Sequence, residues 1–432
     1  MKLQNNFGHC ITIFFLIAVF STSNAQFKMA GGNPQRTGFV DQEGILTEPE
    51  IIWERNLNVS GESATQPIID DDENVYVTGA PEGGKDKPIT KDPRGTFISY
   101  DKNGNERWRY DWNWNPTDRN YRGASGMYSI PAITPFNSII IGFRYGWMRS
   151  FNLDDGSIVW EHDFSTDREP FTSSPVIDEK GYAYIHSRNS QILIKIKSKD
   201  GEIEWAHRFG DDSRGVVSSP TLSHDENTLY IGRTVDDSYL YSINTNDGTY
   251  RWAWSPEVSS GHSFAWGIPV VDKNGDIYIQ DEVYTNLYAV KERGRLHEKR
   301  WTYKPEQKGD DVPRLMAVDD NTIYSSYFAD HPVVFALNLD GTKKWGRKLT
   351  EGHSIGGFIV DKDVLYFPLN GTENIYALDK KNGKTLWQKN IGKSNCEFSE
   401  GMSITKDGTI YVGTNGTKKH PNNATLVALK GK

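Results

Sequence analysis

The stretch Asp155-Gly156-Ser157-Ile158-Val159-Trp160 decides the fold, because its pattern recurs along most of the chain. In each copy, an Asp-Gly or Asn-Gly pair is followed by three residues and then a tryptophan. A stretched copy ends at Trp301, where Arg293-Gly294 replaces the usual pair. Such a pair supplies the positive φ angle that a tight hairpin needs, so each copy predicts a turn and then a strand. The regular copies end at Trp108, Trp160, Trp205, Trp252, Trp345 and Trp387.

A second pattern precedes each of these tails. Small residues and a proline lead into apolar residues and an aspartate, as in Ser173–Asp178, and an alternating run such as Thr228–Gly232 follows. A period of roughly 40–50 residues with about four short strands per unit is typical of a β-propeller blade. Each tail tryptophan can then hold the outer strand of one blade against its neighbour by burying a large ring.

The tryptophans give seven complete blades and part of an eighth, which has strands at 399–405, 409–413 and 424–429 but no final tryptophan strand. Glu50–Glu54 resembles an outer strand without a blade. Joining the two would close the ring and remove open sheet edges. We therefore predict an all-β fold, a single eight-bladed β-propeller rather than a seven-bladed one. The complete blades are expected at residues 64–111, 128–163, 172–208, 217–254, 265–303, 313–348 and 354–389.

The first 25 residues have the pattern of a secretory signal peptide. They contain Lys2, a short apolar run and a small-residue exit at Ala25. We expect cleavage near Ala25/Gln26, a mature propeller domain at 26–432, and a secreted or periplasmic location. No cysteine lies at the cleavage point, so we expect no lipid anchor, and Cys396 is the only cysteine of the mature chain.

Composition excludes some partners. The formal net charge is −8, which disfavours nucleic acids and anionic membrane surfaces. Aromatic residues make up 12% of the chain, enough to supply rings for a binding surface as well as for the core. The uninterrupted repeat favours one closed ring over several domains.

The sequence Gly-Gly-Asn-Pro-Gln-Arg-Thr-Gly at residues 31–38 adds a further signal. Together with the tryptophan tails, it resembles the quinoprotein-like (PQQ-like repeat) β-propeller superfamily. The resemblance spans nearly all of the mature chain and implies the propeller fold. It does not assign an activity, because unrelated functions share this scaffold.

The two faces of such a ring differ. Turns between strands one and two and between strands three and four lie on one side, which we call the hairpin face. Links between blades and loops between strands two and three lie on the other side, the loop face. The loop-face segments vary in length and carry arginine, histidine and aromatic residues, whereas the hairpin turns are uniform. Because binding and catalysis often use loops on a rigid scaffold, we expect the functional site on the loop face.

At least eight arginines are expected on the loop face, which indicates an anionic ligand, because guanidinium groups pair with carboxylates and sulfates. Certain β-propeller polysaccharide lyases, notably ulvan lyases, are similar to this chain in size, export and scaffold. That resemblance implies β-elimination on sulfated, uronate-containing poly- or oligosaccharides, with the chain acting as a lyase or as an oligosaccharide dehydratase. It also implies a site built from histidine, tyrosine and arginine.

In that reaction, arginine neutralises the uronate carboxylate, a histidine or tyrosine removes the C5 proton, and another protonates the leaving oxygen. Arg144 and Arg188 are the candidate neutralisers. Tyr128 and His186 are the candidate base and acid, in an order that stays open, and a hydrogen-bonded core histidine is the alternative for His186. The candidate substrate-binding residues are Arg122, Trp147, Arg233, His262, Trp266, Tyr284 and Arg314.

Other functions stay open. Envelope propellers that help assemble outer-membrane proteins resemble this chain in blade number and in the Gly-Gly-Asn-Pro start, which would make it a non-enzymatic scaffold. A passive glycan-binding protein would present the same arginines and rings. Larger quinone-dependent dehydrogenases commonly have adjacent cysteines, which this chain lacks. We therefore expect no PQQ or other cofactor, no metal site, and a monomer that binds an anionic oligo- or polysaccharide.

Overall fold

The computed structural model contains strands and turns, and none of the residues that it describes lies in a helix. No described segment is therefore a helix that could span a membrane. The prediction of an all-β fold is confirmed. The described residues are 27–59, 65–79, 94–113, 129–143, 146–164, 171, 173–187, 192–208, 216–235, 237–256, 263–264, 267–307, 309, 311–392, 398–420 and 423–431.

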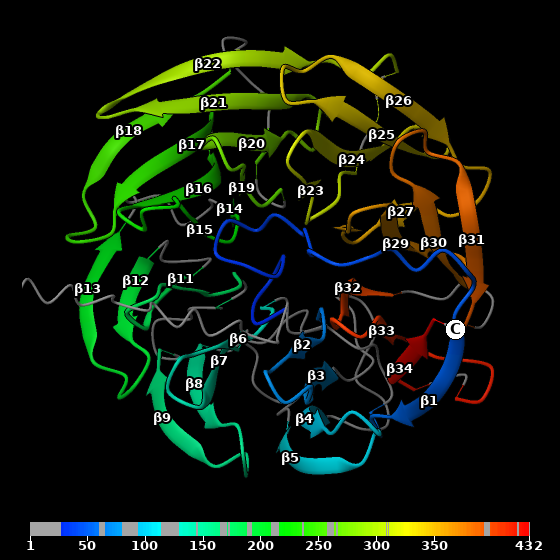
Figure 1. Cartoon of the computed structure of the whole chain (residues 1–432). Coiled ribbons are helices and arrows are strands. Elements are labelled where there is room, and N and C mark those ends of the chain that lie inside the picture. The colour runs from blue at the N-terminus through cyan, green and yellow to red at the C-terminus, as the bar shows by residue number, and fades with distance from the viewer. Residues whose placement is uncertain are drawn as a thin grey trace, which may run out of the picture.

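Eight antiparallel sheets stand around a central axis, each as one blade, as the sequence predicts (Figure 1). The first four blades contain, from the axis outward, β2 (Ile68–Ile69), β3 (Val75–Gly79), β4 (Arg94–Tyr100) and β5 (Glu106–Asn113); β6 (Ala132–Ile133), β7 (Ser138–Gly142), β8 (Trp147–Asn152) and β9 (Ile158–Asp163); β10 (Val176–Ile177), β11 (Tyr182–His186), β12 (Ile192–Lys197) and β13 (Ile203–Arg208); and β14 (Val216–Val217) with β15 (Thr221–Leu222), β16 (Thr228–Val235), β17 (Asp237–Asn244) and β18 (Tyr250–Trp254).

The remaining blades repeat this order. They contain β19 (Val270–Val271), β20 (Asp276–Gln280), β21 (Leu287–Arg293) and β22 (Leu296–Tyr303); β23 (Ala317–Val318), β24 (Thr322–Phe328), β25 (Pro332–Asn338) and β26 (Lys343–Lys348); β27 (Ser354–Ile355) with β28 (Ile359–Val360), β29 (Val364–Asn370), β30 (Asn374–Asp379) and β31 (Thr385–Asn390); and β32 (Phe398–Ile404), β33 (Thr409–Thr414), β34 (Thr425–Lys430) and β1 (Glu50–Asn56).

The ring is closed by its two ends. Strand β1 pairs antiparallel with β34, from Glu50 opposite Lys430 to Asn56 opposite Thr425. Figure 1 shows the two strands side by side at the outside of blade eight. This pairing supplies the missing outer strand and confirms the predicted closure, which removes a sheet edge that would otherwise be exposed.

The Asp-Gly and Asn-Gly turns explain how neighbouring blades are joined. Gly156 has a φ of +72°, and a Cβ added there would lie 2.6 Å from the ring of Trp108 in the preceding blade. The Trp108 Nε1–H donates to the carbonyl of Leu153, just before the same turn, at 2.9 Å. Only glycine brings the turn this close to the indole, so the recurring pair is required by packing as well as by φ. The tail tryptophans are structural.

A second recurring contact lies within the blades. Aspartates that end the innermost strand accept a hydrogen bond from a tyrosine of the next strand, as Asp70 does from Tyr76 at 2.7 Å. Asp70 is buried, so the acidic run at 70–73 begins with a structural acceptor inside the blade. The same contact is made by Asp178 and Tyr184, Asp272 and Tyr278, Asp319 and Tyr324, and Asp361 and Tyr366.

The chain from Phe27 to Ile45 crosses the centre of the ring (Figure 1). Its backbone carbonyls accept hydrogen bonds from amides at the hairpin-face ends of the innermost strands, so they satisfy donors that face the axis. These amides belong to Ile69, Ile133, Leu222, Val271, Val318 and Val360, in six different blades. The segment therefore ties most of the ring together from the inside.

Arg36 extends this link. Its side chain is fully buried, and its guanidinium group donates five hydrogen bonds to backbone carbonyls. The acceptors belong to the same segment and to blades three and four: Ala30, Ser174, Pro175 and Pro220. The rigid fork of an arginine suits this role, because it can reach several carbonyls at once. The conspicuous sequence at 31–38 is thus a structural element.

Candidate functional site

Six of the expected site residues lie outside the described part of the chain. The structure places the other five in five different blades. The six outside are Arg122, Tyr128, Arg144, Arg188, His262 and Trp266. The constellation expected across blades two to four is therefore described only at Trp147, His186 and Arg233.

His186 ends strand β11 and is 1% exposed. Its backbone amide donates to the Ser173 hydroxyl, and the same hydroxyl donates to the His186 carbonyl, both at 2.8 Å. The residue pairs with Leu193 of β12. His186 thus occupies the interior of blade three, the environment of the core histidine weighed from the sequence.

Trp147 begins β8 and belongs to an aromatic cluster that surrounds Arg149. The Arg149 guanidinium lies 4.4 Å from the Trp147 ring centroid and also stands over Tyr110 and Phe143. Its Nε donates to Glu161 at 2.9 Å. This guanidinium is therefore already stacked and paired. Because Tyr110 belongs to blade one and Trp147 to blade two, the cluster joins these two blades.

Three further candidates lie in blades four to six and are half-buried. Arg233 pairs in β16 with Tyr239 of β17. Tyr284 lies in the turn after β20, where its amide donates to the Asp281 carboxylate at 3.2 Å. The backbone of Arg314 links neighbouring blades, because its carbonyl accepts from the amide of Ile268.

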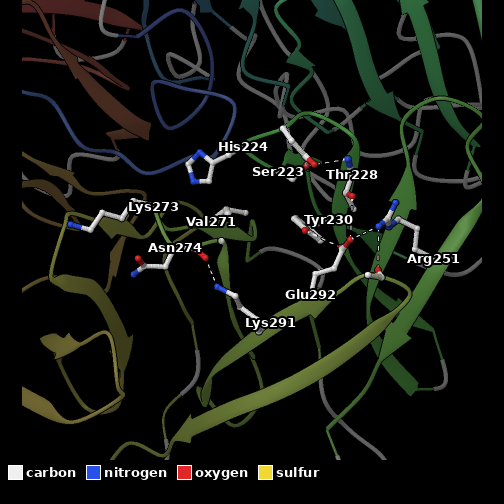
Figure 2. Close-up of a pocket in the computed structure, with 13 residues that line it drawn as sticks. Ser223, His224, Thr228, Tyr230, Arg251, Val271, Lys273, Asn274, Lys291 and Glu292 are labelled. Atoms are coloured by element: carbon white, nitrogen blue, oxygen red, sulfur yellow. Dashed lines mark hydrogen bonds and ion pairs between the residues drawn. The ribbon is translucent and has the colours of Figure 1, made fainter.

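A cavity of about 460 Å³ lies between blades four and five at the hairpin face. Figure 2 shows Ser223, Thr228, Tyr230 and Arg251 on one side of it, and His224, Lys273, Asn274 and Lys291 on the other. The cavity is on the hairpin face, whose turns are uniform in sequence, and not on the loop face, where the functional site was expected. The available signal was the Arg293-Gly294 pair, the one departure from the Asp-Gly or Asn-Gly pattern among the complete tails.

Glu292 organises one wall of this cavity. Its side chain is 14% exposed and lies 2.8 Å from Arg251, as an ion pair. The carboxylate also accepts hydrogen bonds from the hydroxyls of Tyr230 and Ser242, both at 3.0 Å. Burial and then the Glu292 carboxylate raise the pKa of Tyr230 above its usual value, so this phenol stays protonated and donates.

Charged groups surround the rest of the cavity. Lys291 donates to the carbonyl of Asn274 and lies 3.5 Å from Asp276. Lys273 forms an exposed pair with Asp320 at 2.8 Å. Within the described residues, no group of three or more His, Cys, Asp or Glu side chains could hold a metal ion. The cavity is therefore suited to binding a polar molecule.

Solved structures of low sequence identity share the fold. A quinohemoprotein alcohol dehydrogenase from Comamonas testosteroni is 12% identical, with a TM-score of 0.67 over 95% of this chain and 81% of that one. BamB from Moraxella catarrhalis is also 12% identical, with a TM-score of 0.60 over 89% of this chain and 100% of that one. A europium-containing methanol dehydrogenase is 11% identical, with a TM-score of 0.68 over 95% and 98% of the two chains. No curated protein matches the chain.

A family model matches both halves of the ring. The model described as outer membrane protein assembly factor BamB aligns with residues 47–254 and 236–405. The expectation of a uronate lyase or dehydratase acting in ulvan or polysaccharide degradation was wrong, because the matching family and the similar structures above are an assembly factor and dehydrogenases. The resemblance to PQQ-like repeat propellers was correct. The chain belongs to the family described as outer membrane protein assembly factor BamB.

Proposed function

We propose that this protein is a non-catalytic scaffold of the cell envelope, which docks other proteins during assembly of outer-membrane proteins. The observation that carries the proposal is the family match across both halves of the ring. The signal-peptide pattern in residues 1–25, which lie outside the described part, supports an exported location.

The geometry supports a docking role. The ring is closed through β1 and β34, and the chain from Phe27 to Ile45 holds the innermost strands together. The Asp-Gly and Asn-Gly turns join neighbouring blades by contacts between glycine and tryptophan. Such a frame holds the described strands and turns in fixed positions, and a fixed surface loses little conformational entropy when a partner binds.

The second candidate function is a quinone-dependent dehydrogenase, which the fold neighbours suggest. This chain lacks the adjacent cysteine pair that is common in the larger dehydrogenases, since its two cysteines, Cys10 and Cys396, are far apart in sequence. We therefore derive no redox step for this protein.

Site-specific photo-crosslinking tests the docking proposal. A photoreactive amino acid replaces Asp330, an exposed residue in the loop between β24 and β25 on the loop face. Asn321, which is exposed in the β23–β24 turn of the same blade on the hairpin face, is the matched control. After irradiation of cells, mass spectrometry should identify outer-membrane assembly proteins crosslinked at position 330 and not at position 321.

The result that overturns the proposal is equally specific. If position 330 captures no envelope protein above the level at position 321, the loop face is not a docking surface. Far-ultraviolet circular dichroism of both purified variants checks that the two proteins fold alike.

A further inference from the structure

Six tryptophans of the outer strands make the same contact with the next blade. The indole Nε1–H donates to the backbone carbonyl three positions after the residue that pairs with the next blade's own tail tryptophan. In blade two, Ser150 pairs with Trp160, and the Leu153 carbonyl accepts from Trp108 of blade one. The other donors and acceptors are Trp53 and Lys102, Trp160 and Ser198, Trp205 and Thr245, Trp301 and Leu339, and Trp345 and Lys380.

The junction between blades four and five departs from this pattern. Because Ala289 pairs with Trp301, the expected acceptor for Trp252 is the backbone carbonyl of Glu292. The Trp252 Nε1 is buried, however, and makes no hydrogen bond to any described residue. The backbone of Glu292 therefore does not join the two blades in the usual way.

The hairpin of blade five explains the lost contact. Strands β21 and β22 stay paired as far as Arg293 and Leu296, and a Cβ added at Gly294 would meet no atom within 4 Å. The imidazole of His297 lies against the Trp252 ring, with the ring centroids 5.3 Å apart. The turn has thus moved away from blade four, and the cavity of about 460 Å³ lies beside this junction.

The side chain of Glu292 makes the connection instead. Its carboxylate accepts from Tyr230 of β16 and Ser242 of β17, both at 3.0 Å, and pairs with Arg251 of β18 at 2.8 Å. Figure 2 shows it between Tyr230 and Arg251. One carboxylate of blade five thus bonds to three strands of blade four. Because it is only 14% exposed, salt screens these contacts little.

Blade four also lacks an acceptor of its own for its tyrosine. Tyr230 pairs with Thr221, and Ser223 stands two residues further on, where five other blades have the aspartate that accepts from the tyrosine. The Ser223 hydroxyl donates to Asp225 at 2.6 Å. Glu292 therefore supplies from blade five the carboxylate that blade four lacks.

We propose that Glu292 is a clasp that holds the outer strands of blade four to blade five and compensates for two changes, the displaced turn and the missing aspartate. At the six regular junctions a backbone carbonyl makes the connection, which any side chain would allow. Here the connection depends on one charged side chain. The Thr221 hydroxyl also bonds across this junction, to the Pro269 carbonyl, but from the innermost strand. Loss of the clasp should therefore let the outer strands of blade four open locally.

Hydrogen–deuterium exchange of the mature protein, followed by mass spectrometry of peptides from β16 to β18, tests the clasp. Glu292→Gln keeps the shape of the side chain but removes its charge. Exchange in these strands should become at least about tenfold faster, because hydrogen bonds to a charged group are lost. Glu298→Gln is the matched control on the same hairpin. Glu298 is 47% exposed and pairs with Arg293 and Arg300, and exposed pairs contribute little, so exchange should not change.

Ser223→Asp gives a second and more specific test. In the Glu292→Gln background it should restore slow exchange, because Tyr230 regains the aspartate acceptor that the tyrosines of five other blades have. In the wild-type background it should make exchange faster, because two carboxylates would then compete for one site. The same substitution is thus expected to act in opposite directions.

The proposal is overturned if Glu292→Gln exchanges no faster than Glu298→Gln, or if Ser223→Asp acts in the same direction in both backgrounds. Should Glu292→Gln alone fail to fold, the double variant is expected to fold. A double variant that folds no better than Glu292→Gln would equally overturn the proposal.

Discussion

Arg36 gives the sharpest stability prediction, because it joins the N-terminal segment to blades three and four. Replacing Arg36 with methionine keeps a long apolar side chain but removes five hydrogen bonds and leaves four buried carbonyls without this donor. A buried acceptor without a partner costs about 1–3 kcal/mol, so even the low end gives a loss of about 4 kcal/mol. Burial lowers the pKa of Arg36 to about 9, so the charged group is desolvated in the native protein, and its removal in the variant returns part of this loss.

Urea denaturation followed by tryptophan fluorescence measures this loss as a lower free energy of unfolding. Arg55→Met is the matched control, because Arg55 also donates to backbone carbonyls, those of Glu54, Asn103 and Gly104, but on the partly exposed outer strand β1. Water can replace it there, so we expect a change within about 0.5 kcal/mol. Equal losses in the two variants would refute the reasoning that Arg36 holds the centre of the ring together.

Two further predictions concern the turns and the buried tyrosines. Gly156→Ala and Gly294→Ala each place a Cβ at a positive φ, which costs about 1–2 kcal/mol in both variants. Only the Cβ at 156 would also meet an indole, at 2.6 Å, so thermal denaturation should show a clearly lower melting temperature for Gly156→Ala. Equal melting temperatures would contradict the role given to the regular turns. Burial, and then a nearby carboxylate, raises the pKa of six tyrosines above the usual 10.0, so above pH 10 the unfolded chain releases protons that the native chain retains. Stability should fall there by up to about 1.4 kcal/mol per tyrosine per pH unit, which urea titrations at increasing pH would detect, and a constant free energy of unfolding up to about pH 12 would refute it. The tyrosines are Tyr76, Tyr184, Tyr230, Tyr278, Tyr324 and Tyr366.

The blades could be predicted from sequence because their signals are local. A pair such as Asp155-Gly156 determines a turn within a few residues, and Gly156 has the positive φ that the pair requires. The closing strand was also predictable, since Glu50–Glu54 has strand character without a blade and the eighth blade lacks its outer strand.

The path of the N-terminal segment could not be predicted in this way. Arg36 donates to carbonyls that lie 138 and 184 residues further along the chain. Backbone carbonyls are present in every residue, so no side-chain pattern marks these acceptors. The sequence at 31–38 pointed to a family but not to the contacts that Arg36 makes.

The candidate site shows a different limit. Residues were chosen by type and by face, and that choice does not reveal whether a side chain such as His186 is buried inside its blade. The cavity at blades four and five depends on Gly294 not contacting the preceding tryptophan, which is a three-dimensional absence of contact. In the sequence, it is visible only as Arg293-Gly294 in place of Asp-Gly.

The most direct test of the scaffold function is quantitative proteomics of outer membranes from cells with and without this protein. The account predicts lower levels of several outer-membrane β-barrel proteins in the deletion strain, and restoration by the wild-type chain. Restoration should fail when the exposed loop at Asp330 is replaced in a variant that still folds. An unchanged outer-membrane proteome in the deletion strain would contradict the proposal that this propeller acts in the assembly of those proteins.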